Sequence, residues 1–325
     1  LFDTVDKNGK IIAESKLPKS LQHIIKNTPQ KLVVFINPPY AEATSGKTPA
    51  GTGKNKAKVA RENMICERYK DELGKANNEL FAQFFMRIYK EIPNCILGSF
   101  STPKHINSQN FSKFRQLFKA KFLKGFAVPS YTFDNVPGAF PICFLVWNLG
   151  DKQEIKKVKV NIFNENNKKI CKKNFYVENK FISAWLRKFY DKNNANLAWL
   201  ILPGVDMQVQ NGIYITKQPT QSDIKQHKLA QITKYNLIPF CVYFAVRHAI
   251  KASWINNKDQ FLFPKNKWQQ DKEFHNDCLA FALFYGQNKI TSKDDINHFI
   301  PFSESQVVAK EAFKSDFMFR FINGK

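Results

Sequence analysis

The feature that most constrains the fold is a short apolar run that ends at two consecutive prolines. Val33–Ile36 is followed directly by Asn37–Tyr40, which reads Asn-Pro-Pro-Tyr. Four apolar residues without alternation predict a strand buried on both faces, as in a parallel α/β sheet. Each proline fixes its φ angle and lacks an N–H donor, so the ladder of hydrogen bonds cannot continue past this point. The chain is therefore predicted to leave the sheet at the carboxyl end of a strand, where α/β sheets hold their ligands.

The turn Asn37–Tyr40 offers hydrogen-bond acceptors and one aromatic face. The Asn37 side chain supplies a carbonyl oxygen, and the backbone carbonyls of the two prolines have no neighbouring N–H to bind. Tyr40 adds a ring large enough to stack on a heterocycle. This combination predicts a grip for an exocyclic amino group on a planar ring.

Strands and helices alternate up to about residue 150. Apolar residues at helical spacing predict helices over 65–73, 80–88 and 111–118, and apolar runs predict strands over 95–100, 122–128 and 141–147. The last two strands are joined by a connection too short for a crossover helix, so we expect an antiparallel hairpin. We assign residues 1–150 to one α/β domain on this basis.

The pattern changes after Gly150. Alternation over 157–162 and a return over 170–177 predict a polar-faced hairpin, followed by strands near 197–202 and 212–216. From Ile224 onwards we expect mostly helix. Residues 151–325 are therefore assigned to a second, α+β region. The lysines of the hairpin either contact phosphates or form a solvated face, and the sequence leaves both open.

The chain is strongly basic, with a net charge of +23 over 325 residues. Such an excess predicts a polyanionic partner, because phosphate backbones bind through counterion release. Compositional bias from an AT-rich genome explains the same excess equally well. No run of about 18 apolar residues occurs, so we expect a soluble protein that does not span a membrane.

Two further patterns limit the chemistry. The six cysteines are scattered singly, which argues against a disulfide framework and against a zinc site, and favours a reducing, cytoplasmic location without a bound metal. The loop 44–54 is rich in glycine and lysine but fails the spacing of a P-loop, because Thr48 stands where the first glycine belongs. Nucleotide hydrolysis is therefore disfavoured.

The Asn37–Tyr40 turn matches the N-P-P-Y signature of amino-group methyltransferases. Residues 95–100 and 132–147 are similar to the later motifs of adenine-N6-specific DNA methyltransferases of restriction-modification systems, in the γ order that places target recognition last. The resemblance implies the second half of an S-adenosylmethionine-dependent, Rossmann-like sheet over 1–150. It also implies a target-recognition region for double-stranded DNA over 151–325, with a nuclease fused or separate.

The resemblance implies roles for individual residues. The side chain of Asn37 and the carbonyl of Pro38 would accept the two hydrogens of adenine N6, with Pro39 fixing the turn. Tyr40 would stack on the base after it has been flipped out of the duplex. Phe133 would close the other face of the base, although Tyr131 competes for that role and plain hairpin packing explains Phe133 equally well.

One part of the family pattern is missing. No glycine-rich F-x-G-x-G cofactor motif occurs in these residues, and only Asp3 is a candidate for contact with S-adenosylmethionine. We therefore expect that the chain begins after the first three strands of the sheet. An upstream segment or a separate subunit would carry the cofactor motif, and the isolated fragment would be inactive. Two alternatives remain, namely methylation of RNA or of a protein amide, and a non-catalytic DNA-binding fragment or subunit.

Overall fold

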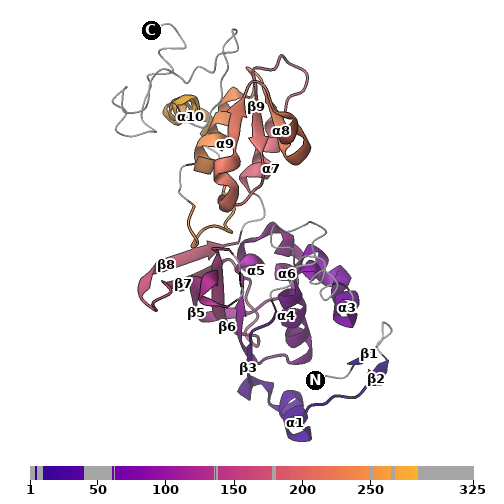
Figure 1. The fold of residues 1–325 in the computed structure, drawn as a ribbon. Helices are drawn as coiled ribbons and strands as arrows, with labels where there is room; N and C mark the ends of the chain where they lie inside the picture. The colour runs from indigo at the N-terminus through magenta and orange to yellow at the C-terminus, as the bar shows by residue number, and fades with distance from the viewer. Residues whose placement is uncertain are drawn as a thin grey trace. The chain divides into compact units, whose positions relative to one another are not determined.

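The computed structural model describes residues 4–5, 10–39, 61, 63–134, 136, 138–177, 181–248, 252–264 and 268–284. Asp3, Tyr40 and the loop 44–54 lie outside these described residues. The chain divides into two compact units, Leu1–Asn179 and Lys180–Lys325, each described here by itself (Figure 1).

The first unit is built on a six-stranded mixed sheet in the order β3-β4-β6-β5-β7-β8 (Figure 1). Its strands are β3 (Val33–Ile36), β4 (Ile96–Ser101), β5 (Lys121–Pro129), β6 (Pro141–Asn148), β7 (Lys157–Phe163) and β8 (Lys169–Tyr176). β3 runs parallel to β4, and β7 runs parallel to β5. β6 lies antiparallel between β4 and β5, which confirms the predicted hairpin. The carboxyl ends of β3, β4, β5 and β7 therefore meet at one edge, called here the carboxyl edge.

The hairpin β7–β8 belongs to this sheet. The two compact units therefore divide near residue 180, whereas the sequence was divided at residue 150. The alternation of residues predicted the hairpin itself correctly. It did not reveal that β7 pairs with β5, because backbone pairing between distant strands leaves no mark on the period of the side chains.

Helices complete the first unit. They are α1 (Lys19–Asn27), α3 (Met64–Leu73), α4 (Leu80–Glu91), α5 (Lys104–Asn107) and α6 (Ser112–Leu117), with a small two-stranded sheet of β1 (Thr4–Val5) and β2 (Ile11–Ala13). The Asn63 side chain caps α3 by accepting the N–H of Cys66. Gly74 ends α3 with a φ of 55°, a conformation that glycine adopts at little cost.

Helices α3 to α6 cover one face of the sheet (Figure 1). On this covered face Leu97, Leu145 and Trp147 are fully buried. Phe118 contacts the Trp147 ring and stacks on Phe114, with ring centroids 6.0 and 4.9 Å apart. Burial of aromatic side chains of this size supplies most of the stabilisation of such a core.

The opposite face, called here the uncovered face, carries a row of phenylalanine rings. Phe144 lies at the centre, with Phe35, Phe100 and Phe126 at ring-centroid distances of 5.6, 4.9 and 5.6 Å. Because the helices lie on the other side, these rings meet one another rather than a covering layer within the described part of the chain. Val33 and Phe35 are 70% and 65% exposed.

The exposure of β3 corrects a prediction. The apolar run Val33–Ile36 was expected to be buried on both faces, but β3 is the last strand of the sheet in the described residues, with one face open. The sequence shows which side chains favour burial. It does not show whether a neighbouring strand or helix is present to bury them.

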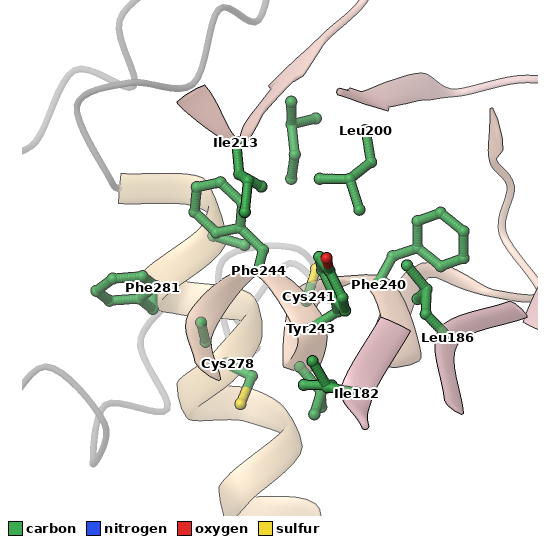
Figure 2. Close-up of a cluster of buried hydrophobic side chains, with 14 of the residues drawn as sticks. Ile182, Leu186, Leu200, Ile213, Phe240, Cys241, Tyr243, Phe244, Cys278 and Phe281 are labelled. Atoms are coloured by element: carbon green, nitrogen blue, oxygen red, sulfur yellow. The ribbon is translucent and has the colours of Figure 1, made fainter. Parts of the chain in front are cut away.

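The second unit has a three-stranded antiparallel sheet with helices packed against it. Its elements are α7 (Ile182–Leu186), β9 (Ala198–Leu202), β10 (Tyr214–Thr216), α8 (Gln221–Gln226), β11 (Lys228–Ile232), α9 (Leu237–His248) and α10 (Lys272–Phe284). Phe240, Phe244, Cys241 and Cys278 belong to a buried cluster between helices and strands (Figure 2). The prediction of mostly helix beyond Ile224 is wrong for β11, which pairs with β9 from Lys228 to Ile232.

None of the described helices combines the length and the hydrophobicity that a membrane span requires.

Candidate functional site

The Asn-Pro-Pro turn lies where the sequence predicts it, at the carboxyl end of β3. Ile36 pairs with Ser99 of β4, so Asn37 leaves the sheet at the level of Phe100. Asn37 and Pro39 are exposed, whereas Pro38 is buried. The two prolines leave no N–H group here to extend the ladder, so the turn presents oxygen acceptors at the carboxyl edge. Tyr40, the fourth residue of the motif, lies outside the described residues.

Phe133 lies at the same edge, on the uncovered face. The short 3-10 helix Ser130–Thr132 follows β5, and the N–H of Phe133 donates to the carbonyl of Ser130 at 3.1 Å. The Phe133 ring meets the Phe100 ring edge to face, with centroids 5.5 Å apart. The register places Asn37 level with Phe100, and the Phe133 ring packs on that same phenylalanine, although 96 positions separate Asn37 from Phe133 in the sequence.

The loop that carries Phe133 is fixed by one hydroxyl group. Ser130 is fully buried, and its Oγ donates to the carbonyl of Gly138 at 2.6 Å and accepts the N–H of Phe140 at 3.2 Å. Gly138 itself has a φ of 100°, which a residue with a side chain adopts only with strain. The loop is thus closed across its base, and this holds Phe133 against the sheet.

Tyr131, the competing aromatic residue, lies differently. It is half-exposed, and partial burial and the neighbouring Glu165 carboxylate raise the pKa of its hydroxyl. Glu165 belongs to the turn between β7 and β8, so Tyr131 is directed toward that turn. Phe133, in contrast, contacts the Phe100 ring of the sheet. Its packing on Phe100 and the proposed stacking role are compatible, because one ring has two faces.

A cavity lies beside the turn on the helix side. Its volume is about 370 Å³, and it is lined mainly by apolar atoms of Pro39, Ile65, Leu80, Phe84, Asn63, Gln83 and Arg87. Asn63 donates to Gln83 at 3.1 Å, and Gln83 donates to the carbonyl of Asn77 at 2.7 Å. These bonds hold the polar wall in place. This cavity was not predicted, because its lining comes from three segments that meet only in the fold.

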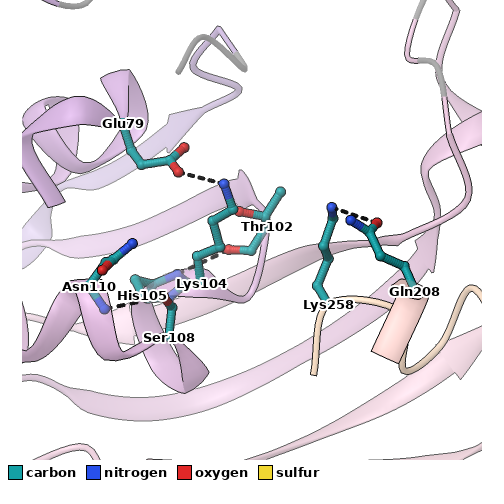
Figure 3. Close-up of polar contacts among 8 residues, drawn as sticks. All are labelled: Glu79, Thr102, Lys104, His105, Ser108, Asn110, Gln208 and Lys258. Carbon is teal, nitrogen blue, oxygen red and sulfur yellow. Dashed lines mark hydrogen bonds and ion pairs between the residues drawn. The ribbon is translucent and has the colours of Figure 1, made fainter. Parts of the chain in front are cut away.

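The segment after β4 contributes polar groups near the same edge (Figure 3). Lys104 forms an ion pair with Glu79, and the ring of His105 lies 3.2 Å from the carbonyl of Thr102. His105 is fully buried among Phe81, Phe85, Phe114 and Trp147, and burial lowers its pKa to about 3. A ring that stays neutral at pH 7 and is closed off from solvent is a core residue, not a proton acceptor for a substrate.

Comparison with known proteins identifies no family. No family model matches the chain, and no curated protein matches it. Solved structures that show similarity include restriction-modification enzymes and their subunits. A modification subunit of a putative type I restriction enzyme from Vibrio vulnificus YJ016 is 10% identical, with a TM-score of 0.26 over 42% of this chain and 28% of that chain.

Two other structures extend over more of this chain. The first is a nuclease-deletion mutant of the Type ISP restriction-modification enzyme LlaGI in complex with a DNA substrate mimic. It is 12% identical, with a TM-score of 0.34, over 59% of this chain and 22% of that chain. The second is a DrdV–DNA complex. It is 15% identical, with a TM-score of 0.32, over 65% of this chain and 23% of that chain. This chain thus spans about a quarter of the length of the proteins it resembles.

Arg247 and Asp223, two buried polar residues of the second unit, have internal hydrogen-bond partners. Arg247 donates to the carbonyls of Gly204 and Asp206 and to the hydroxyl of Tyr243, and its guanidinium lies 4.9 Å from the centre of the Phe261 ring. Tyr214 donates a hydrogen bond to Asp223. Burial, as the larger cause, and this hydrogen bond, as the smaller one, raise the pKa of Tyr214 to about 12. These groups stabilise the unit.

The described part of the chain does not assemble a metal site, and the cofactor candidate is not among its residues. Asp3, the candidate for cofactor binding, lies outside it. Among the described residues no group of three or more metal-binding side chains occurs. All six cysteines are free thiols, and five of them are buried as packing residues.

Proposed function

We propose that this chain provides the base clamp and the target-recognition region of an adenine-N6-specific DNA methyltransferase of a restriction-modification system. The observations that carry the proposal are that β3 ends at Asn37, level with Phe100 in the register of the sheet, and that the Phe133 ring packs on Phe100. The sheet order supports it, because an antiparallel strand set between two parallel ones is typical of the second half of the methyltransferase fold. The similarities to solved structures are too low to add weight.

The clamp would act on the geometry of the amino group. The Asn37 side-chain carbonyl and the Pro38 carbonyl would each accept one N6 hydrogen. In free adenine the N6 lone pair is delocalised into the ring. Two acceptors that favour a pyramidal nitrogen direct the lone pair toward a methyl donor in line with it. As the N–C bond formed, the sulfur–methyl bond of the donor would break and the sulfur would leave as a neutral thioether. The resulting amine cation is acidic enough to lose its proton to water without a strong base.

Two aromatic residues would hold the flipped base. Tyr40 would stack on one face and Phe133 on the other, and such stacking stabilises an extruded base by about 1–3 kcal/mol. Phe133 is held in place for this task by the loop that Ser130 closes. The basic composition of the chain fits a double-stranded DNA partner.

S-adenosylmethionine, which this fold implies, does not fit the residues at hand. The sequence has no glycine-rich motif to approach the cofactor, and β3 shows exposed Val33 and Phe35 rather than a polar cradle. We propose that a segment beyond these residues, upstream in the same polypeptide or on a separate subunit, holds the cofactor and supplies the methyl group. A nuclease, fused or separate, would complete the system.

The proposal is tested in cells that lack their own adenine methyltransferases. The gene is expressed with its native upstream sequence, and N6-methyladenine in digested genomic DNA is measured by mass spectrometry. Asn37→Ala should remove the N6-methyladenine while duplex binding by the purified protein is retained. Retained methylation in the Asn37→Ala variant would exclude the clamp, and N4-methylcytosine in place of N6-methyladenine would reassign the target base.

A non-catalytic DNA-binding subunit is the second candidate, favoured by the missing cofactor motif. The same experiment separates the two. A subunit without catalytic function would leave genomic DNA unmethylated with Asn37 intact. Methyl groups found in RNA or on protein amides, but not in DNA, would favour an N-methyltransferase that acts on RNA or on protein.

A further inference from the structure

The hairpin β7–β8, at the end of the sheet opposite β3, concentrates positive charge. Residues 156–176 contain seven lysines and one acidic residue, a net charge of +6 over 21 positions, whereas the whole chain carries +23 over 325. The charge density of the hairpin is therefore about four times that of the chain. A uniform compositional bias toward lysine does not produce such a local excess.

The alternation of the strands sorts three of these lysines onto one face. Val158, Val160 and Ile162 of β7 are buried, so Lys157 and Lys159 point the other way and are exposed. In the register of the hairpin, Lys159 pairs with Asn174 and Asn161 pairs with Lys172. Paired residues share a face, so Lys157, Lys159 and Lys172 lie together with neutral polar neighbours. None of the three forms an ion pair with another described residue.

This lysine face is continuous with the uncovered face of the sheet. Phe126 of β5 pairs with Asn161 of β7, and the Phe126 and Phe163 rings are 6.1 Å apart. β4 and β5 both run antiparallel to β6, so they run in the same direction, and β7 is parallel to β5. The β7–β8 turn, which follows the carboxyl end of β7, therefore lies at the carboxyl edge. The contact between Tyr131 and Glu165 joins this turn to the loop that carries Phe133.

The dimensions match a duplex centred on the base clamp. Four strand spacings separate β3 from β7 in the sheet order, which corresponds to about 19 Å. At 3.4 Å per base pair, that is about five or six base pairs from the base held at Asn37. From Phe163 to Lys157 the strand extends about 20 Å away from the carboxyl edge. The lysines are thus placed to meet the backbone that flanks the target base.

We propose that Lys157, Lys159 and Lys172 form a phosphate-binding face for duplex DNA beside the base clamp. The position relative to the target base rests on the proposed function, but the binding itself does not. Protection of the edge strand β8 against pairing with other chains is the competing role for lysines here. Edge protection requires charge anywhere on β8, whereas phosphate binding requires the three lysines that share the exposed face.

The test is the salt dependence of duplex binding by the full chain, without cofactor and without methylation. Binding of a fluorescent 30-base-pair duplex is followed by anisotropy between 50 and 200 mM salt. Lys157→Gln, Lys159→Gln and Lys172→Gln in one protein should weaken binding about tenfold or more at 100 mM salt. They should also make the negative slope of the logarithm of the association constant against the logarithm of the salt concentration shallower by about 2 to 3. Each phosphate contact contributes about −0.9 to that slope.

A charge-matched control comes from the other edge of the sheet. Lys16, Lys19 and Lys31 are exposed and precede β3, and their replacement by Gln removes the same net charge. The control should leave the slope nearly unchanged. Equal slopes in the two triple variants would overturn the proposal, as would tighter binding of a single strand than of the duplex. Because the clamp is not needed for this binding, Asn37→Ala should retain the wild-type slope even if the proposed methylation fails.

Discussion

The two faces of the six-stranded sheet differ in how they are finished. On the covered face, helices α3 to α6 enclose Leu97, Leu145 and Trp147 completely. On the uncovered face, Phe35, Phe100, Phe126 and Phe144 contact one another at the surface, and Val33 is 70% exposed. Both faces are apolar, so composition does not explain the difference.

The contrast indicates what each face is for. Sheets with parallel strands are normally covered on both sides, because crossover helices pack on each face. The covered face accounts for the stability of the first unit. The uncovered face combines a contiguous apolar surface with the Asn37 turn and the lysine face, and exposed apolar surface of this kind is typical of assembly and binding. Three experiments test this division of roles.

The largest expected effect concerns the apolar end of the uncovered face. We expect the segment that would hold the cofactor to pack on the exposed side of β3, and Val33→Lys places a charge there. Burying an unpaired charge costs about 3 kcal/mol or more, so methylation in the cellular assay should fall about a hundredfold. Ile170→Lys is the matched control, since Ile170 is 50% exposed on β8 at the other end of the sheet. Wild-type methylation by Val33→Lys would show that nothing packs on β3.

The second experiment concerns the covered face and uses pH. Burial lowers the pKa of His105 to about 3, whereas the unfolded chain titrates near 6.5. As the pH falls, His105 therefore takes up a proton in the unfolded state before it does so in the folded state. The free energy of unfolding is at its full value above pH 6.5 and decreases as the pH falls toward 3. Between pH 7 and pH 5 the loss is about 2 kcal/mol. Arg115, the nearest charged group, acts in the same direction.

Urea denaturation at both pH values measures this loss. His105→Phe should reduce the pH-dependent fall in the free energy of unfolding by that amount. His23→Gln, which changes an exposed histidine on α1, should leave it unchanged. A pH dependence that survives in the His105→Phe variant would mean that His105 is open to solvent, contrary to its enclosure by four aromatic rings.

The smallest effect separates Tyr131 from Phe133, two of the aromatic residues of the β5–β6 loop. Phe133→Leu retains apolar packing on Phe100 but removes the flat face, and loss of base stacking worth about 1–2 kcal/mol should lower the methylation rate about tenfold. Tyr131→Leu should have little effect, because Tyr131 is directed toward Glu165. Equal rates for the two variants would leave Phe133 with a packing role only. Thermal denaturation of both variants controls for stability.

The sequence predicted the local elements well. The turn at Asn37 begins where the prolines require it, and the hairpin β5–β6 follows from a connection too short for a crossover. What the sequence did not predict depends on distant partners. The exposure of Val33 depends on a neighbour that the described residues lack, and the place of β7 depends on its pairing with β5.

The candidate site shows the same limit. Asn37 was identified from its motif, and its position at a strand end was predicted from the prolines. The contact of Phe133 with Phe100 joins residues 33 positions apart, and no pattern in either segment encodes it. The lysine face required both the register of β7 with β8 and the pairing of β7 with β5. Sequence periodicity gives the face of a strand but not the neighbour on it.

The antiparallel strand β6 has a consequence for the order of folding. β4 and β5 do not pair with each other; each pairs with β6, which comes after both in the chain. The two halves of the sheet therefore join only when residues 141–148 are in place. Phe144, at the centre of the uncovered face, arrives in that same step. During synthesis on the ribosome, the surface beneath Asn37 and Phe133 would thus form at once and late, only after residues 141–148 have emerged, rather than grow strand by strand.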